Sequence, residues 1–181
     1  MKEIIAHTVE VLQRGGIILY PTDTIWGIGC DARNAAAVER LYTIKERDRS
    51  KSMLVLVRNS GNGVQRVLRP TTYILPRAIW HDEMHLEVAD NLPADDGTLG
   101  IRMPQHSFCQ EVIRLLGAPL VSTSANLSGH PSPTCYEDIE KALIERIDYC
   151  VPPLGEFLSG ETQGSRIVKL DADGRETVIR P

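Results

Sequence analysis

An apolar segment is followed directly by small polar side chains in the sequence Leu19-Tyr20-Pro21-Thr22-Asp23-Thr24-Ile25-Trp26-Gly27. Residues 16–20 form a short apolar run that includes the β-branched Ile17 and Ile18, which predicts a short buried strand. Pro21 has no N–H to donate to a central ladder, so pairing should end there. Because ligands bind beyond the carboxyl ends of strands in open α/β sheets, residues 22–24 mark a candidate site. The alternative is an ordinary polar turn.

The composition is that of an ordinary folded protein. A chain of 181 residues suits a single domain, residues 1–181, and its 42% hydrophobic and 24% charged content is typical. The net charge of −4 means that any site for a polyanion must be a local cluster of cations. The four cysteines form no C-x-x-C pair, and no apolar run approaches the ~18 residues of a membrane span. We therefore expect a cytoplasmic protein without membrane contact.

Strands alternate with helices along the chain and a hairpin follows, which predicts an α/β fold with a mixed sheet. Helices are expected over residues 3–14, 35–45, 108–116 and 134 to about 147. Asn34 is the expected N-cap of the second helix. Capping boxes are expected for the third helix, from Ser107 and Gln110, and for the fourth, from Thr134 and Glu137. Strands are expected over 16–20, 26–30, 53–57, 73–75, 99–102 and 120–123, and the hairpin over 166–170 and 177–179.

A basic cluster follows the second expected helix. It places four cations within seven residues: Lys45, Arg47, Arg49 and Lys51. A triphosphate needs several cations, because its charge must be held in one geometry. The alternative is a solvated loop whose exposed charges favour the helix C-terminus and contribute little to folding.

A loop of small polar residues, 122–129, follows another apolar strand. It offers four hydroxyls and one side-chain amide, and such loops bind phosphate or ribose through N–H and O–H donors. A hydrogen-bonded turn is an equally good interpretation. Arg102 ends the expected strand 99–102 on the same face as Gly100, where it could meet a carboxylate or form a surface ion pair with Asp95 or Asp96.

Other functional motifs are absent from the sequence. There is neither a G-x-x-x-x-G-K-[ST] nor a G-x-G-x-x-G motif. His81 and His85 could share a helix face, but they do not form H-E-x-x-H, and we expect no metal-ligating residues. No local signature supports a cysteine nucleophile.

Four blocks of sequence resemble the YrdC-like threonylcarbamoyl-AMP synthases. They are residues 20–30, 44–53, 100–104 and 121–134, and their order and spacing span most of the chain. The resemblance implies a twisted, mixed parallel and antiparallel sheet with flanking helices and a concave, locally positive cavity. It also implies synthesis of L-threonylcarbamoyladenylate from L-threonine, bicarbonate and ATP, with Mg²⁺ accompanying ATP and pyrophosphate released. A downstream threonylcarbamoyl transferase complex would use the product at position 37 of tRNA, and the protein could contact tRNA or double-stranded RNA.

The resemblance also implies roles for particular residues. The phosphates of ATP would be held by Lys45, Arg47 and Lys51, of which Lys45 and Arg47 are the catalytic candidates. The nucleotide would also be bound by Ser124, Asn126, Ser132 and Arg180. Threonine would be held by Thr24, Arg102 and the backbone at Ser122. No covalent nucleophile is needed, because a carbamate oxygen can attack the α-phosphorus once positioned.

Three departures from the family pattern bear on substrate contacts. The segment 58–72 is short, Arg166 follows Ser165 where relatives tend to have threonine, and Leu56 replaces a histidine of longer relatives. Two other functions remain as alternatives: an RNA-binding module without catalysis, and a paralogue that handles another carbamoyl substrate, as in hydrogenase maturation proteins. The presence of Lys45, Arg47 and the 122–129 loop favours the synthase.

Overall fold

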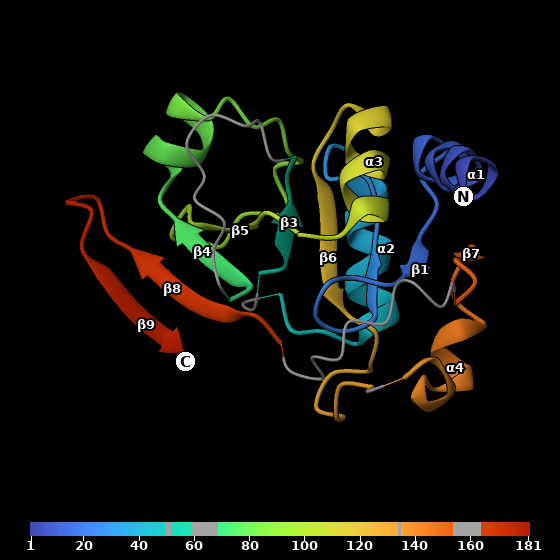
Figure 1. Ribbon diagram of the computed structural model, residues 1–181. Helices are drawn as coiled ribbons and strands as arrows, with labels where there is room; N and C mark the ends of the chain where they lie inside the picture. The colour runs from blue at the N-terminus through green and yellow to red at the C-terminus, as the bar shows by residue number, and fades with distance from the viewer. Residues whose placement is uncertain (50–51, 59–68, 134, 154–163) are drawn as a thin grey trace.

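A mixed sheet with helices on both faces forms the centre of the molecule in the computed structural model, which describes residues 1–49, 52–58, 69–133, 135–153 and 164–181 (Figure 1). The strands are β1 (Ile18–Tyr20), β2 (Gly27–Gly29), β3 (Leu54–Leu56), β4 (Thr71–Leu75), β5 (Leu99–Arg102), β6 (Leu120–Ser124), β7 (Tyr149–Cys150), β8 (Arg166–Leu170) and β9 (Glu176–Arg180). Within the described residues they follow the order β7-β1-β2-β6-β3-β5-β4-β8-β9.

Parallel and antiparallel pairs alternate irregularly across this sheet. The pairs β1–β7, β3–β5 and β4–β8 are parallel. The pairs β1–β2, β2–β6, β3–β6, β4–β5 and β8–β9 are antiparallel. The prediction of a mixed α/β sheet with flanking helices is therefore confirmed.

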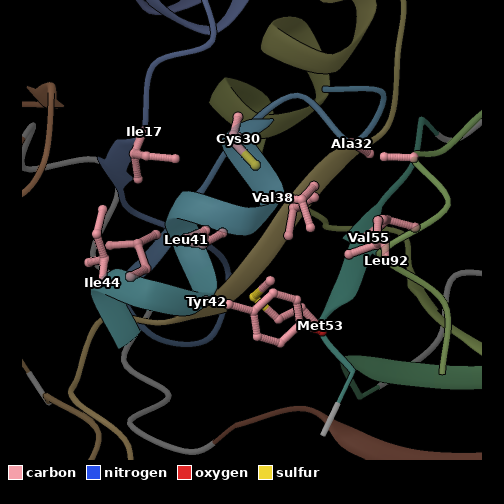
Figure 2. Packing of buried hydrophobic residues seen from close by; sticks show 14 of the residues in the cluster. Ile17, Cys30, Ala32, Val38, Leu41, Tyr42, Ile44, Met53, Val55 and Leu92 are labelled. Atoms are coloured by element: carbon pink, nitrogen blue, oxygen red, sulfur yellow. The ribbon is translucent and has the colours of Figure 1, made fainter. Parts of the chain in front are cut away.

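Helix α2 (Ala35–Lys45) covers one face of the sheet. It begins where expected, because Asn34 Oδ1 accepts a hydrogen bond of 3.0 Å from the Ala37 N–H, a cap that contributes about 1 kcal/mol. Figure 2 shows its side chains Leu41 and Tyr42 among the buried residues that include Val55 of β3. These contacts fix the end of α2, and with it Lys45, against the sheet.

Helices α1 (Lys2–Gln13) and α3 (Ser107–Leu116) pack together on the opposite face. Strand β1 serves both faces by alternation: Leu19 belongs to the cluster around α2, whereas Ile18 and Tyr20 belong to the cluster under α1 and α3. The same alternation puts Ile101 in the α2 cluster and leaves Gly100 and Arg102 on the other face, as predicted. The part of that face beyond the helices is where a cavity opens.

One predicted helix is wrong. The segment expected to form a helix to about 147 contains a 3₁₀ turn, Tyr136–Asp138, and a short helix, α4 (Lys141–Ile144). The backbone is extended between them, with ψ of 126° at Ile139 and 128° at Glu140, so one helix cannot continue through. Thr134, its expected cap, lies outside the described residues.

Strand β7 was not predicted, because two residues carry no alternation that a sequence pattern could reveal. Asp148, just before it, accepts a hydrogen bond of 2.7 Å from the Ile17 N–H and pairs with Arg40. These contacts attach β7 to the edge of β1. Figure 1 shows β7, α4 and α1 at one end of the sheet and the β8–β9 hairpin at the other.

Two local predictions are also corrected. Helix α3 begins at Ser107 itself after His106, without a side-chain cap bond, and Gln110 Nε2 instead donates to Pro104 O at 2.7 Å. His81 lies in a π-helix, Ala78–Glu83, whereas His85 lies beyond it with a φ of 54°, so the two do not share a helix face. In the part of the chain that the structure describes, none of the helices is long and apolar enough to cross a membrane.

Candidate active site

A cavity of about 260 Å³ opens on the face of the sheet that α1 and α3 leave uncovered. Its lining comes from both halves of the sheet: residues 22, 24–27, 47, 52–54, 72, 74, 100, 102, 122–124, 132, 165, 167 and 180. Gly100 contributes no side chain, so the floor of the cavity is open above β5. Its volume lies near the lower end of the ~300–1,000 Å³ typical of ligand sites.

Three guanidinium groups line this cavity, and none of its described lining residues is acidic. Arg47 Nη2 donates to Ser52 O at 3.0 Å, and Arg180 donates to Ser165 O through Nε at 2.9 Å and Nη2 at 2.5 Å. Burial lowers the pKa of Arg47, while burial and then the charge of Arg102 lower the pKa of Arg180. The crowding of like charges means that a bound anion would be stabilised.

Arg102 is held by the polar turn that follows β1. Its Nη1 donates to Thr24 Oγ1 at 2.8 Å and its Nη2 forms an ion pair with Asp23, whereas its buried Nε has no hydrogen-bond partner among the residues that the structure describes. Asp23 in turn accepts a hydrogen bond of 2.9 Å from the Gln105 N–H. The interpretation of Arg102 as a surface ion pair with Asp95 or Asp96 is therefore wrong.

The turn itself is ordered by its hydroxyls. Thr22 Oγ1 donates to Ile25 O at 2.7 Å and accepts from the Thr24 N–H at 3.1 Å. The two threonine hydroxyl oxygens are also 3.1 Å apart. Residues 22–24 therefore form the polar turn that was the alternative, and Thr22 and Thr24 of this turn line the cavity.

Lys45 lies behind the cavity and not in it, which corrects the expectation of an exposed charge. It is only 1% exposed, and its Nζ donates to Ser124 O at 2.6 Å, to Asn126 O, and to Asn126 Oδ1 at 3.3 Å. Burial first and the charge of Arg47 second lower the pKa of Lys45 to about 7. Its ammonium group braces the loop after β6.

Asn126 is also buried and bonded within the loop after β6, outside the described cavity lining. Its Nδ2 donates to Leu127 O at 3.0 Å and to His130 O at 2.6 Å, so its side chain is occupied within the loop. The remaining predicted residues within the described chain all line the cavity: Thr24, Arg47, Arg102, Ser122, Ser124, Ser132 and Arg180. Lys51 lies outside the described residues.

The lining residues that were not predicted include two with hydroxyl groups, Thr72 and Ser165. The hydroxyls of Thr72 and Ser165 are 2.7 Å apart and lie on the cavity floor beside Gly100. Thr72 pairs with Arg102 across β4 and β5, which the sequence could not show without the strand order. No group of three or more potential metal-ligating side chains occurs among the described residues.

Comparison with known proteins identifies the family. Residues 10–181 match the Sua5/YciO/YrdC family, whose description reads "Telomere recombination". The threonylcarbamoyl-AMP synthase of Pseudoalteromonas translucida is 34% identical over 173 residues, which cover 90% of this chain and 91% of that protein. The mouse protein of the same name is 30% identical, and the match covers 99% of this chain and 67% of the mouse protein. The chain belongs to the Sua5/YciO/YrdC family.

Solved structures share the fold. Pyrococcus abyssi Sua5, crystallised with L-threonine, matches 98% of this chain with a TM-score of 0.78 and 22% identity. Escherichia coli YciO matches 99% with a TM-score of 0.71 and 23% identity. The chain spans 53% of the Sua5 chain and 89% of the YciO chain. At these identities the likeness establishes the fold alone.

Proposed function

We propose that the protein is a threonylcarbamoyl-AMP synthase, which converts L-threonine, bicarbonate and ATP to L-threonylcarbamoyladenylate and pyrophosphate. The observation that carries the proposal is the meeting of three arginines, Arg47, Arg102 and Arg180, in one cavity with the hydroxyls of Thr24 and Ser122. The named relatives that match almost the whole chain support the same activity.

Threonine would bind at the Arg102 side of the cavity. The guanidinium is fixed by Asp23 and Thr24 before any ligand arrives, so little side-chain entropy remains to be lost on binding. Its fork can meet a carboxylate with two parallel hydrogen bonds, which a lysine could not do. The backbone and hydroxyl at Ser122 would provide further contacts.

The triphosphate of ATP would bind at the Arg47 and Arg180 side, with Ser124 and Ser132 as further donors. Lys51 remains a proposed phosphate ligand. Lys45 and Asn126 would act indirectly, by holding the loop that carries Ser124. Mg²⁺ would enter with the phosphates of ATP, because the described lining contains no carboxylate to hold it separately.

The proposed reaction needs positioning and charge more than a nucleophile of the protein. The threonine amine forms a carbamate with bicarbonate and releases water; a carbamate oxygen then bonds to the α-phosphorus, and the bond to pyrophosphate breaks. Negative charge builds on the phosphates as this happens, and the arginines of the cavity would stabilise it. The product would then pass to a transferase complex that modifies position 37 of tRNA.

Pyrophosphate release tests this proposal. The protein is incubated with ATP while threonine and bicarbonate are supplied together or singly. Release should require both, and equal turnover of ATP without them, or none with both present, would contradict the proposal. RNA binding without turnover would favour the non-catalytic alternative.

Arg47 and Arg49 offer a matched pair of variants for the same assay. Arg47→Ala should cost on the order of 2–4 kcal/mol of transition-state stabilisation. Arg49 pairs with Glu39 and lies 5.4 Å from the Tyr42 ring centre, outside the cavity lining. Arg49→Ala should therefore leave turnover nearly unchanged; equal losses in both variants would argue against a specific role for Arg47.

A further inference from the structure

The hydroxyls that line the cavity near Arg102 include those of Thr24 and Ser122, and each of these two is bonded to another hydroxyl of the protein. A hydroxyl has one proton to donate and two lone pairs that accept. What each can offer a ligand therefore depends on which protein group already uses its proton or a lone pair.

The proton of Thr24 is already in use. Thr22 donates its only hydroxyl proton to Ile25 O, because a carbonyl oxygen can only accept. In the hydrogen bond between the Thr22 and Thr24 hydroxyls, Thr24 is therefore the donor. Thr24 Oγ1 also accepts from Arg102 Nη1 at 2.8 Å. One lone pair remains, and Thr24 can therefore only accept a hydrogen bond from a ligand.

The hydroxyl of Ser122 has the opposite role and can donate a hydrogen bond to a ligand. Its Oγ accepts a hydrogen bond of 2.7 Å from the phenol of Tyr20, which is fully buried. Burial raises the pKa of Tyr20, so the phenol keeps its proton. Within the part of the chain that the structure describes, Ser122 Oγ makes no other hydrogen bond, and its own proton is available to the cavity.

The contact between Tyr20 and Ser122 depends on the strand between them. Tyr20 is on β1 and Ser122 on β6, and β2 lies between these strands. The β2 residues on this face are glycines: a Cβ on Gly27 would lie 3.3 Å from Ser122 Oγ and 3.4 Å from Tyr20 Cζ, and one on Gly29 would lie 3.3 Å from Tyr20 Cε1. Glycine at position 27 leaves room for the tyrosine ring to cross β2, whereas the nearest atom to a Cβ on Gly29 would be Val121 O at 1.8 Å, so Gly29 is required first by the neighbouring backbone.

We propose that Tyr20 and Thr22 are positioning residues that give the two cavity hydroxyls opposite roles, with Ser122 donating to the carboxylate of the amino acid and Thr24 accepting from its amine. This inference rests on the proposed function. An amine that donates one N–H to Thr24 keeps its lone pair free to attack carbon. Arg102 and Ser122 together then hold the carboxylate at the other end of the same ligand.

A double-mutant cycle on threonine binding tests the role of Tyr20. The dissociation constant of L-threonine is measured by calorimetry for the wild type, Tyr20→Phe, Ser122→Ala and the double variant. Tyr20→Phe should weaken threonine binding about three- to tenfold, the scale of one net hydrogen bond. In the Ser122→Ala background the same change should have an effect of less than about twofold, since the hydroxyl on which Tyr20 acts is gone.

The outcomes separate the inference from the proposed function. Additive losses in the cycle, or unchanged affinity in Tyr20→Phe, would overturn the role of Tyr20 while the synthase assignment stands. Failure of the wild type to bind threonine would overturn both. Tyr149→Phe, which removes a phenol outside the described cavity lining, is the control for loss of a hydroxyl as such and should bind normally.

Thr22 provides an independent test by rescue. Thr22→Val frees the proton of Thr24 and should weaken threonine binding, whereas Thr22→Ser keeps the hydroxyl and should restore it to within about twofold of the wild type. The affinity for ATP should change little in either variant. Equal behaviour of the valine and serine variants would contradict the assigned polarity of Thr24.

Discussion

The buried ammonium of Lys45 shows how a single residue can serve a site without touching the ligand. It donates to two backbone carbonyls and one amide oxygen of the 124–126 segment, which follows the cavity-lining end of β6. Removing the ammonium leaves those oxygens without their donor in a buried place. The cluster of cations at 45–51 therefore contains at least one residue with a structural role.

Lys45→Met is expected to lower the free energy of unfolding by about 2–3 kcal/mol, because three buried oxygens lose their only side-chain donor among the described residues. Urea unfolding followed by circular dichroism measures the change. Lys141→Met, on the exposed side of α4, is the control and should unfold like the wild type. Unchanged stability in Lys45→Met would mean that the loop does not depend on the ammonium.

The stability contributed by Lys45 should depend on pH. Its pKa falls from the ordinary value of 10.5 to about 7 in the folded protein. Between these values the unfolded chain binds more protons than the folded one, so the free energy of unfolding should rise from pH 7 towards pH 10. This rise should be absent from Lys45→Met. No rise between pH 7 and pH 10 in the wild type would show that the three oxygen acceptors offset burial and the charge of Arg47.

Arg102→Lys should separate the two substrates. Lysine keeps the charge but loses the fork that meets a carboxylate, so the threonine requirement should rise at least about tenfold, or about 1.4 kcal/mol. The ATP requirement should change much less. Saturation curves for each substrate provide the measurement, and equal weakening of both would remove Arg102 from the proposed threonine site.

At the scale of the element, the β8–β9 hairpin carries a cavity residue on an exposed strand. Every residue of β9 is exposed, yet Arg180 reaches back to Ser165 O at the cavity. Arg180→Ala should therefore raise the ATP requirement several-fold with little change in the melting temperature. Arg175→Ala, in the turn of the same hairpin, should change neither quantity. Loss of stability in Arg180→Ala alone would mean that Arg180 acts as a brace of the hairpin.

Elements with a strong local signal could be predicted from the sequence. Helix α2 begins after the N-cap Asn34, and strand β5 has an alternating pattern and is followed by Pro104. Both elements have the predicted bounds. Strand β7 and the break that shortens the predicted helix to α4 could not be predicted, because contacts such as that of Asp148 with Ile17 act over long separations in the chain. A pattern of neighbouring residues contains no information about them.

At the scale of the whole molecule, the cavity depends on the order of the strands. β6 lies between β2 and β3, which brings the 122–124 segment beside both the turn after β1 and the start of β3. The sequence placed Arg102 and Thr24 at strand ends, but the Asp23 ion pair and the Thr72–Ser165 contact follow only from this order. Residue type predicted which groups could bind a ligand, and topology determined which of them meet.

Incorporation of labelled carbon into the product tests whether the protein is a threonylcarbamoyl-AMP synthase. The protein is incubated with ATP, L-threonine and ¹³C-bicarbonate, and the products are analysed by mass spectrometry. The proposed function predicts an adenylate that contains threonine and one labelled carbon, formed together with pyrophosphate and absent when threonine is omitted. An adenylate without the label, or pyrophosphate without any threonine-containing product, would contradict it.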